Sequence, residues 1–404
     1  MKGIPLSRVV LYLALLIFLG ITVWLNLLVR TEDQFIDLAR SFLHGSTAFL
    51  EAPDGSWADT TPYNDKFYWP LGPLPAVLLM PFQWLAGLAG IAIYQGYFQP
   101  LLVLALLALV YQVARRTGYN AVDGGYLAFG FTFATANLGV AMWPWSWQFS
   151  QAITCVLLFG AILETTGRRR PWLMGTMFAL AMATRITAVL GILWSFGEIV
   201  FAPTSRREKA RAVVLLALPC VVVLGLLMVY NQVRFGNPMD QGYAKQLVPP
   251  HYETARAQGL FSVRHLPCNL YHFFLAPPTP VRQDEVSTML RPPYLTANPW
   301  GMSVFITSPI FLYLFGLKYS DKTSRLIWLT TLIVAMPIML YFGVGFRQFG
   351  YRYALDFLPL VFFLLIRNHR QQRGDLTPGF KTVILVSAVT NLYLFAGHFI
   401  WGLG

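Results

Sequence analysis

The chain has 404 residues, of which 56% are hydrophobic and only 12% are charged. A soluble domain carries about 25% charged residues, so this composition excludes an ordinary soluble fold and predicts a polytopic membrane protein. Three cysteines are too few for a disulfide framework. The net charge of +12 raises the question of nucleic-acid binding, which the positions of the cations along the chain help to answer.

The first apolar segment, about Val9 to Val29, is long enough to cross a bilayer. Lys2 and Arg8 precede it, so the positive-inside rule predicts a cytoplasmic N-terminus. No small-residue cleavage site follows, and we therefore expect an uncleaved anchor helix. The polar segment after this helix then lies on the outer face.

Residues 31–90 form the predicted first outer loop, which is rich in acids. Of the 18 acids in the chain, seven lie here: Glu32, Asp33, Asp37, Glu51, Asp54, Asp59 and Asp65. The apolar stretch Leu71 to Leu88 is interrupted by three prolines and Gln83. We expect it, and the shorter stretch Leu38 to Gly45, to form helices that lie on the membrane surface. The alternative for Leu71 to Leu88 is a full span.

Ten further spans are predicted after this loop. They cover about Ile91–Ala114, Ala121–Met142, Phe149–Thr166, a hairpin of two spans within Pro171–Ala202, Ala212–Tyr230, Gly301–Leu317, Leu326–Gly343, Tyr353–Ile366 and Thr382–Trp401. A second long outer loop occupies residues 231–300. We thus expect an all-α polytopic fold with about 11 transmembrane helices, in which residues 1–404 form one membrane domain.

The charges fit this arrangement. It places 18 of the 30 lysines and arginines, but only 6 of the 18 acids, on the cytoplasmic side. The inner face therefore carries the whole net charge of +12, and the outer face is neutral. Such a distribution is typical of membrane topology and of contact with anionic lipid. Nucleic-acid binding is not expected.

Two adjacent acids, Glu32 and Asp33, directly follow the first span. A carboxylate there could take a proton from an attacking hydroxyl, as a general base does. The ordinary alternative is a solvated pair at a helix exit. Asp37 lies one helical turn beyond Asp33, so the two could share a face or a divalent cation such as Mg²⁺ or Mn²⁺. Two acids are too few to predict a metal site.

Several arginines are predicted on the same outer side. Arg185 would lie near the tip of the hairpin, about 21 Å along the helix that begins at Pro171. A cation at that depth usually faces a cavity or a partner, unless it extends to the lipid head groups. Arg234, Arg347 and Arg352 would stand at the outer rim, where several arginines suit a phosphate group. Alternatively, Arg352 pairs with Asp356, one turn further on.

Seven segments, in order, resemble blocks of the GT-C superfamily of membrane glycosyltransferases, whose members include protein O-mannosyltransferases and lipid A aminoarabinose transferases. They are EDQFIDLARSFLHG, NDKFYWPLGPLPAVLLMPF, ATRITAVL, YNQVRFGNPMDQGY, HLPCNLYHFFLAPP, GMSVFITSP and FGYRYALDFLPL. The chain departs from the family pattern at two points. It reads Glu-Asp where the family often reads Asp-Glu, and Trp69 replaces the first of two prolines before the glycine.

The resemblance implies an enzyme of the plasma (inner) membrane that moves a sugar from a polyprenyl-phosphate carrier to an acceptor hydroxyl on the outer face, with inversion. The acceptor would be a glycan, a lipid or a protein. Asp33 would be the catalytic carboxylate, with Glu32 as the alternative. Substrate binding would involve Asp37, Lys66, Tyr68, Arg185, Arg234, Tyr243, His265, Arg347 and Arg352. His265 also fits a surface helix without a ligand role. Some relatives use a divalent cation, for which this sequence offers no clear set of ligands.

Two other functions remain open. A polymer ligase acting on a polyprenyl-linked glycan would also use outer arginines on a phosphate. A transporter or flippase would place its critical charges at mid-membrane within paired repeats. Here the acids cluster in outer loops and no repeat is visible, which favours the transferase.

Overall fold

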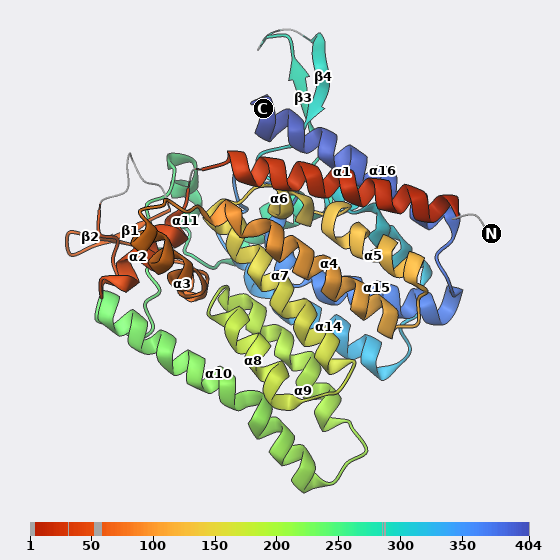
Figure 1. Ribbon diagram of the computed structural model, residues 1–404, viewed down its shortest axis with the longest axis horizontal. Helices are drawn as coiled ribbons and strands as arrows, with labels where there is room; N and C mark the ends of the chain where they lie inside the picture. The colour runs from red at the N-terminus through yellow and green to blue at the C-terminus, as the bar shows by residue number, and fades with distance from the viewer. Residues whose placement is uncertain (1–4, 31, 52–58, 285, 287, 404) are drawn as a thin grey trace.

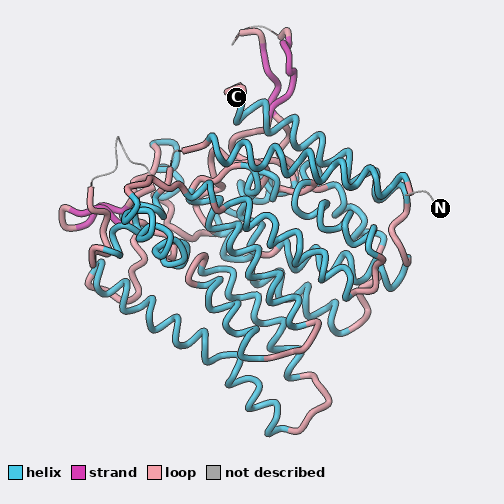
Figure 2. Tube along the Cα trace, in the orientation of Figure 1, coloured by secondary structure: helices cyan, strands magenta, loops and turns pink. Residues whose placement is uncertain are grey.

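The structure, a computed structural model, describes residues 5–30, 32–51, 59–284, 286 and 288–403. Most of these residues are helical, and the long helices pack side by side (Figures 1 and 2). Within the described ranges, two antiparallel hairpins make up the sheets: β1 (Thr61–Tyr63) with β2 (Lys66–Tyr68), and β3 (Thr279–Arg282) with β4 (Leu290–Thr296). Neither hairpin was expected from the all-α pattern. In β1–β2, Asn64 and Asp65 both have positive φ, which suits the tight two-residue turn between the strands.

Six helical segments are long and apolar enough to cross a membrane. They are α1 (Leu6–Leu28), Gln95–Arg116 with α4 (Gln99–Arg116), α7 (Ser146–Thr165), α10 (Arg206–Phe235), α14 (Lys322–Leu340), and Pro378–Ile400, which joins α16 (Pro378–Phe395) to the π-turn η8 (Ala396–Ile400). The chain is therefore a mostly helical membrane protein. These helices correspond to six of the predicted spans, namely those at about Val9–Val29, Ile91–Ala114, Phe149–Thr166, Ala212–Tyr230, Leu326–Gly343 and Thr382–Trp401.

The other expected spans are shorter or broken, so the count of eleven stays a prediction. They are α5 (Ala121–Phe133) with α6 (Asn137–Met142), α8 (Pro171–Met182), η2 (Ile186–Gly191) with α9 (Ile192–Val200), α13 (Val304–Thr307) with η6 (Pro309–Gly316), and η7 (Arg352–Asp356) with α15 (Leu358–Arg373). The break between α13 and η6 has a local cause. Ser308 has a non-helical backbone, and Pro309 has no N–H for a helical hydrogen bond.

The segment from Pro171 to Ala202 folds back on itself, as expected. α8 ends at Met182, and Arg185 takes an extended backbone before η2 begins. After this turn, Gly191 lies against Phe178 of α8. The chain therefore reverses direction with Arg185 at the turn.

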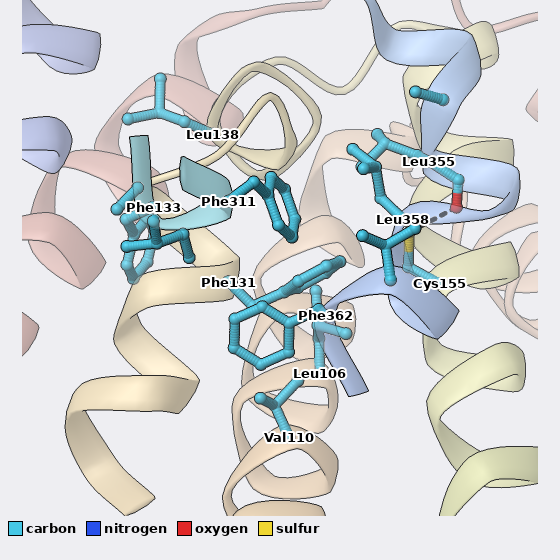
Figure 3. Packing of buried hydrophobic residues seen from close by; sticks show 14 of the residues in the cluster. Leu106, Val110, Phe131, Phe133, Leu138, Cys155, Phe311, Leu355, Leu358 and Phe362 are labelled. Atoms are coloured by element: carbon cyan, nitrogen blue, oxygen red, sulfur yellow. Dashed lines mark hydrogen bonds between the residues drawn. The ribbon is translucent and has the colours of Figure 1, made fainter. Parts of the chain in front are cut away.

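The core lies among α5, α7 and α15. Phe131 makes edge-to-face contacts with Phe159 at 4.6 Å and with Phe362 at 5.1 Å between ring centroids. Figure 3 shows Phe131 and Phe362 packed with Leu106 and Phe311. In its most apolar window, α7 is 72% buried, whereas α10 is only 6% buried. α7 is thus central, and α10 is peripheral, with most of its side chains exposed or half-buried.

The two ends of the helix bundle differ. At one end, cations that the sequence places on the inside make ion pairs, as between Arg170 and Glu164 at 2.8 Å. At the other end, the first long loop contributes α2 (Gln34–Leu43), β1 (Thr61–Tyr63), β2 (Lys66–Tyr68) and α3 (Leu74–Ala89). α3 packs on α2 and carries exposed apolar side chains such as Trp84 and Leu88.

The second long loop meets the first at this end. It contains η3 (Tyr243–Lys245), η4 (Pro250–Tyr252), α11 (Glu253–Arg256), η5 (Val263–His265), α12 (Leu266–Phe274), β3 (Thr279–Arg282) and β4 (Leu290–Thr296). The turn between α8 and η2 lies directly against the first loop, because a Cβ at Gly72 would lie 2.1 Å from the carbonyl oxygen of Ala183. The two long loops and the turn between α8 and η2 therefore enclose one region.

Candidate functional site

A cavity of about 290 Å³, here called the polar cavity, lies where the two long loops meet. It is lined by Glu32, Asp59, Trp145, Trp147, Gln148, Gln246, Val248, Pro249, His251, Tyr252, Tyr341, Phe342, Gly343, Phe346, Arg347, Arg352 and Tyr353. Two acids and two arginines thus face one space. Because these residues come from five separate parts of the chain, only the folded protein brings them together.

A second space of about 470 Å³, here called the apolar cavity, adjoins the first. It is lined by Leu71, Trp147, Arg185, Ile186, Thr187, Met239, Asp240, Gln241, Tyr243, Ala244, Leu260, Phe261, Pro337, Ile338, Tyr341 and Tyr353. The two cavities share Trp147, Tyr341 and Tyr353. These three aromatic side chains form the wall between them.

Glu32 is held at the polar cavity by its backbone. Its carbonyl accepts hydrogen bonds from the hydroxyl of Ser146 at 2.7 Å and the side-chain amide of Gln95 at 3.0 Å. Its φ of 60° lies in the left-handed region, which a residue with a side chain rarely adopts. Asp59 and Arg347, at φ of 76° and 47°, share this feature. Strained backbone of this kind often marks functional sites.

The carboxyl group of Glu32 has a strongly shifted pKa. Burial raises the pKa from 4.5 to about 7, and repulsion from Asp59 acts in the same direction. Arg347 and Arg352 act against this rise. A carboxyl group with a pKa near 7 is suited to exchange protons at physiological pH.

Asp59 is the second carboxylate of the polar cavity. It accepts hydrogen bonds from the indole N–H of Trp147 and the side-chain amide of Gln246, both at 3.0 Å. Its backbone pairs with the second loop, since its N–H donates to the carbonyl of Leu247 at 2.7 Å. Burial raises the pKa of Asp59, while the bond from Trp147 and the charge of Arg352 lower it. The carboxylate is therefore fixed by donors from two distant segments.

Arg352 is buried in the cavity wall without full hydrogen bonding. It is only 6% exposed, and its Nε and Nη1 have no hydrogen-bond partner among the described residues. Its guanidinium lies 4.9 Å from the ring centroid of Tyr353. Nearby, Gln148 is 5% exposed, and its Oε1 also has no partner in the described part of the chain. Buried polar groups are rarely left unpaired, so these atoms point to a ligand.

Arg185 has a buried partner. Its Nε donates to Asp356 at 2.7 Å, and Asp356 is fully buried. The alternative in which Arg352 pairs with Asp356 is therefore wrong. The reason is that η7 (Arg352–Asp356) is a 3₁₀ helix, in which side chains four residues apart no longer share a face. In addition, the turn between α8 and η2 brings Arg185 to Asp356. Arg185 also faces the apolar cavity, as does Tyr243.

Asp33 and Asp37 lie outside the linings of both cavities. The carboxylate of Asp33 accepts a hydrogen bond from the backbone N–H of Gln95 at 2.9 Å. Burial raises the pKa of Asp33 to about 7, and the bond from Gln95 opposes this. Asp37 is half-exposed and pairs with Arg40 at 3.7 Å. Burial raises the pKa of Asp37, and Arg40 lowers it.

The other expected binding residues lie outside the polar cavity. Arg234 is buried and donates to the carbonyl of Trp69 at 2.8 Å, which fixes the floor of the first loop. Tyr68 is buried against Phe235, with ring centroids 5.2 Å apart. His265 is buried with a ring nitrogen 2.9 Å from the carbonyl oxygen of Gly259. Lys66 is exposed on β2. Arg234, Tyr68 and His265 thus support the loops around the site.

Several lining residues were not singled out from the sequence. Trp145, Trp147 and Gln148 belong to the segment WPWSWQFSQ, which was interpreted as an interfacial aromatic belt. Asp59 was one of seven acids, with nothing to distinguish it. The positions of Gln246 and His251 depend on how the second loop folds back. Asp54 lies outside the described residues.

The polar cavity does not fit a resident divalent cation. No group of three or more His, Cys, Asp and Glu side chains in the described ranges is arranged to hold one. Glu32 and Asp59 instead share their cavity with two arginines. A guanidinium already provides, beside the two acids, the positive charge that a Mg²⁺ or Mn²⁺ ion would bring.

Comparison with known proteins gives no family assignment. No protein-family model matches the sequence, and no curated protein matches it either.

Proposed function

We propose that the protein is a glycosyltransferase of the GT-C type. It would move a sugar from a polyprenyl-phosphate carrier to an acceptor hydroxyl on the outer face of the plasma membrane. The observation that carries the proposal is that one cavity contains both Glu32, a buried carboxyl with a pKa near 7, and the N–H groups of Arg352 that have no partner among the described residues. The order of the seven sequence blocks supports the same assignment.

The two cavities suit the two parts of such a donor. The sugar phosphate would lie in the polar cavity, where Arg352 and Arg347 face the phosphate. The Oε1 atom of Gln148 would accept a hydrogen bond from a sugar hydroxyl. The polyprenyl chain would lie in the apolar cavity. The shared wall of Trp147, Tyr341 and Tyr353 would mark the junction between head group and tail.

The reaction is a direct displacement. The acceptor oxygen attacks the anomeric carbon while Glu32 takes its proton. The bond from the anomeric carbon to the phosphate oxygen breaks, and polyprenyl phosphate leaves with the electron pair. Arg352 stabilises the negative charge that develops on the phosphate, and Asp59 faces the positive charge on the sugar ring. Attack opposite to the leaving group inverts the anomeric configuration.

In this proposal the general base is Glu32, not Asp33. The family resemblance implied Asp33 as the catalytic carboxylate, with Glu32 as the alternative. Glu32 lines the cavity with both arginines, whereas the carboxylate of Asp33 is held by the backbone of Gln95. In this proposal Asp33 is a positioning residue that fixes the corner after α1.

The test is incubation of the purified protein in lipid nanodiscs with labelled polyprenyl-phosphate mannose, glucose and aminoarabinose. We expect transfer to an added acceptor, or slow hydrolysis without one, for at least one donor. Absence of both with every donor, together with saturable transport in vesicles, would replace the transferase with a transporter.

A further inference from the structure

The hairpin β3–β4 projects from the body of the protein. In Figure 1 it extends away from α1 and α16, across the direction of both helices. Its base is bound to the end of α16. The N–H of Ala297 donates to the carbonyl of Leu394 at 3.0 Å, and Tyr393 donates its hydroxyl to the carbonyl of Pro293. A Cβ at Gly397 would lie 2.8 Å from Thr296, so the contact is close.

The hairpin exposes large apolar side chains. Val286 is 93% exposed and Met289 is 66% exposed, and Tyr294, Leu290 and Leu295 are each more than 40% exposed. The strand register pairs Leu290 with Arg282 and Leu295 with Pro280. The register shifts between Pro280 and Arg282, so the strands do not keep a simple alternation of faces along this hairpin. Five large apolar side chains exposed on one short hairpin indicate an interaction site.

The base of the hairpin lies at the end of a helix that can cross the membrane. Pro378–Ile400 is such a segment, and its last turns carry aromatic residues. The ring centroids of Tyr393 and Trp401 are 6.5 Å apart, and both side chains are exposed. Exposed Tyr and Trp at the end of a span are typical of the membrane–water interface. The hairpin therefore leaves the body at that level.

We propose that the hairpin β3–β4 is a membrane-surface anchor whose apolar residues insert among phospholipid head groups. An open two-stranded sheet has unpaired backbone groups at its edges, which excludes the hydrocarbon interior. Five exposed apolar side chains make water an unfavourable environment. The interface satisfies both requirements, and exposed Arg282 and Arg291 can contact lipid phosphates. The inference does not depend on the proposed transferase activity.

The test uses the full chain with one labelled cysteine. Val286→Cys, in a Cys220→Ser, Cys268→Ser background, is labelled with an environment-sensitive fluorophore and placed in nanodiscs. Glu253→Cys, on α11 of the same loop, is the control. We expect blue-shifted emission at position 286 that nitroxide-labelled lipids quench and aqueous iodide does not. At position 253 we expect the reverse.

Two other outcomes would overturn the proposal. Quenching by iodide alone would mean that the hairpin stands in water, and protection from both quenchers would mean that another protein covers it. A second variant tests the charge contribution. Arg282→Gln with Arg291→Gln should reduce the blue shift in nanodiscs that contain phosphatidylglycerol and leave it unchanged in phosphatidylcholine. An equal effect in both lipids would remove the role of the arginines.

Discussion

Glu32 and Asp33 are adjacent in sequence, yet their carboxylates lie in different environments. The left-handed backbone of Glu32 turns its side chain into the polar cavity, and the next side chain then meets the N–H of Gln95. Sequence spacing could not separate the two, because both follow the first span directly. The distinction requires the backbone angle at residue 32.

Glu32→Gln should lower kcat/KM by about 10²- to 10⁴-fold, since it removes the general base and keeps the shape of the side chain. Asp33→Asn is the matched control and should cost less, because an amide oxygen can still accept the bond from Gln95. Both variants should still bind donor. A larger loss in Asp33→Asn would return the base to Asp33.

The pKa of Glu32 also predicts a pH dependence. As a base Glu32 must be ionised, so kcat/KM should rise through pH about 7. Stability should change in the opposite direction. Because the folded pKa is raised, the folded state binds more protons than the unfolded state between pH 4.5 and about 7, and stability falls as pH rises through this range. Glu32→Gln should weaken this fall in Tm, and an unchanged Tm profile would contradict the assignment.

The buried ion pair between Arg185 and Asp356 predicts a large loss of stability when the carboxylate of Asp356 is replaced by an amide. Asp356→Asn leaves a buried guanidinium without its counter-charge and should cost about 3–5 kcal/mol, measured by thermal unfolding in detergent. Asp321→Asn is the control, because Asp321 is 40% exposed in its pair with Arg367 and should cost at most about 1 kcal/mol. Equal losses would mean that burial does not set the strength of these pairs.

Among the elements, hydropathy predicted the long straight helices and missed the breaks. α1 and α10 follow directly from continuous apolar runs that end at charges. The run from Ala121 to Met142 was also predicted as one span, yet it breaks after Phe133 into α5 and α6. Apolar composition does not record such a break, because the residues on both sides are buried in protein. The tertiary contacts decide where the helix ends.

Close packing of α8 on α10 depends on Gly175. A Cβ there would lie 2.1 Å from the carbonyl oxygen of Leu216, so Gly175→Ala forces the helices apart and should lower Tm by several degrees. Gly225→Ala, in α10 with no atom within 4 Å of its added Cβ, is the control. It should be neutral or slightly stabilising, because Ala favours helix. A stable Gly175→Ala variant would mean that the two helices separate at little cost.

The separation of two groups of charges along the bundle was predictable, whereas the number of spans and their sidedness stay predictions. The cations assigned to the inner face lie at one end of the bundle, as the pairs of Arg170 with Glu164 and Lys381 with Asp123 show. Glu32, Asp59, Arg347 and Arg352, which are assigned to the outer face, meet in the polar cavity at the opposite end. Which lining residues meet there could not be predicted, since Asp59 and Gln246 approach only through the pairing of two loops.

Cysteine reporters can test sidedness directly. With Cys220 and Cys268 replaced by serine, Arg207→Cys at the start of α10 should be shielded from an impermeant maleimide in intact cells. Glu253→Cys on α11 should be labelled. A reporter at Asn120, before α5, should also be shielded. Labelling at position 120 would mean that Leu74–Ala89 crosses the membrane and that the assignments after it are inverted.

The left-handed backbone at Glu32, Asp59 and Arg347 has a consequence for engineering the protein. Each such residue costs about 1–3 kcal/mol, which glycine would avoid. Selection for thermal stability alone would therefore favour glycine at all three positions and remove the charged groups of the cavity. Stability and activity are in conflict at these three residues, and a library selected by heat should lose function there first.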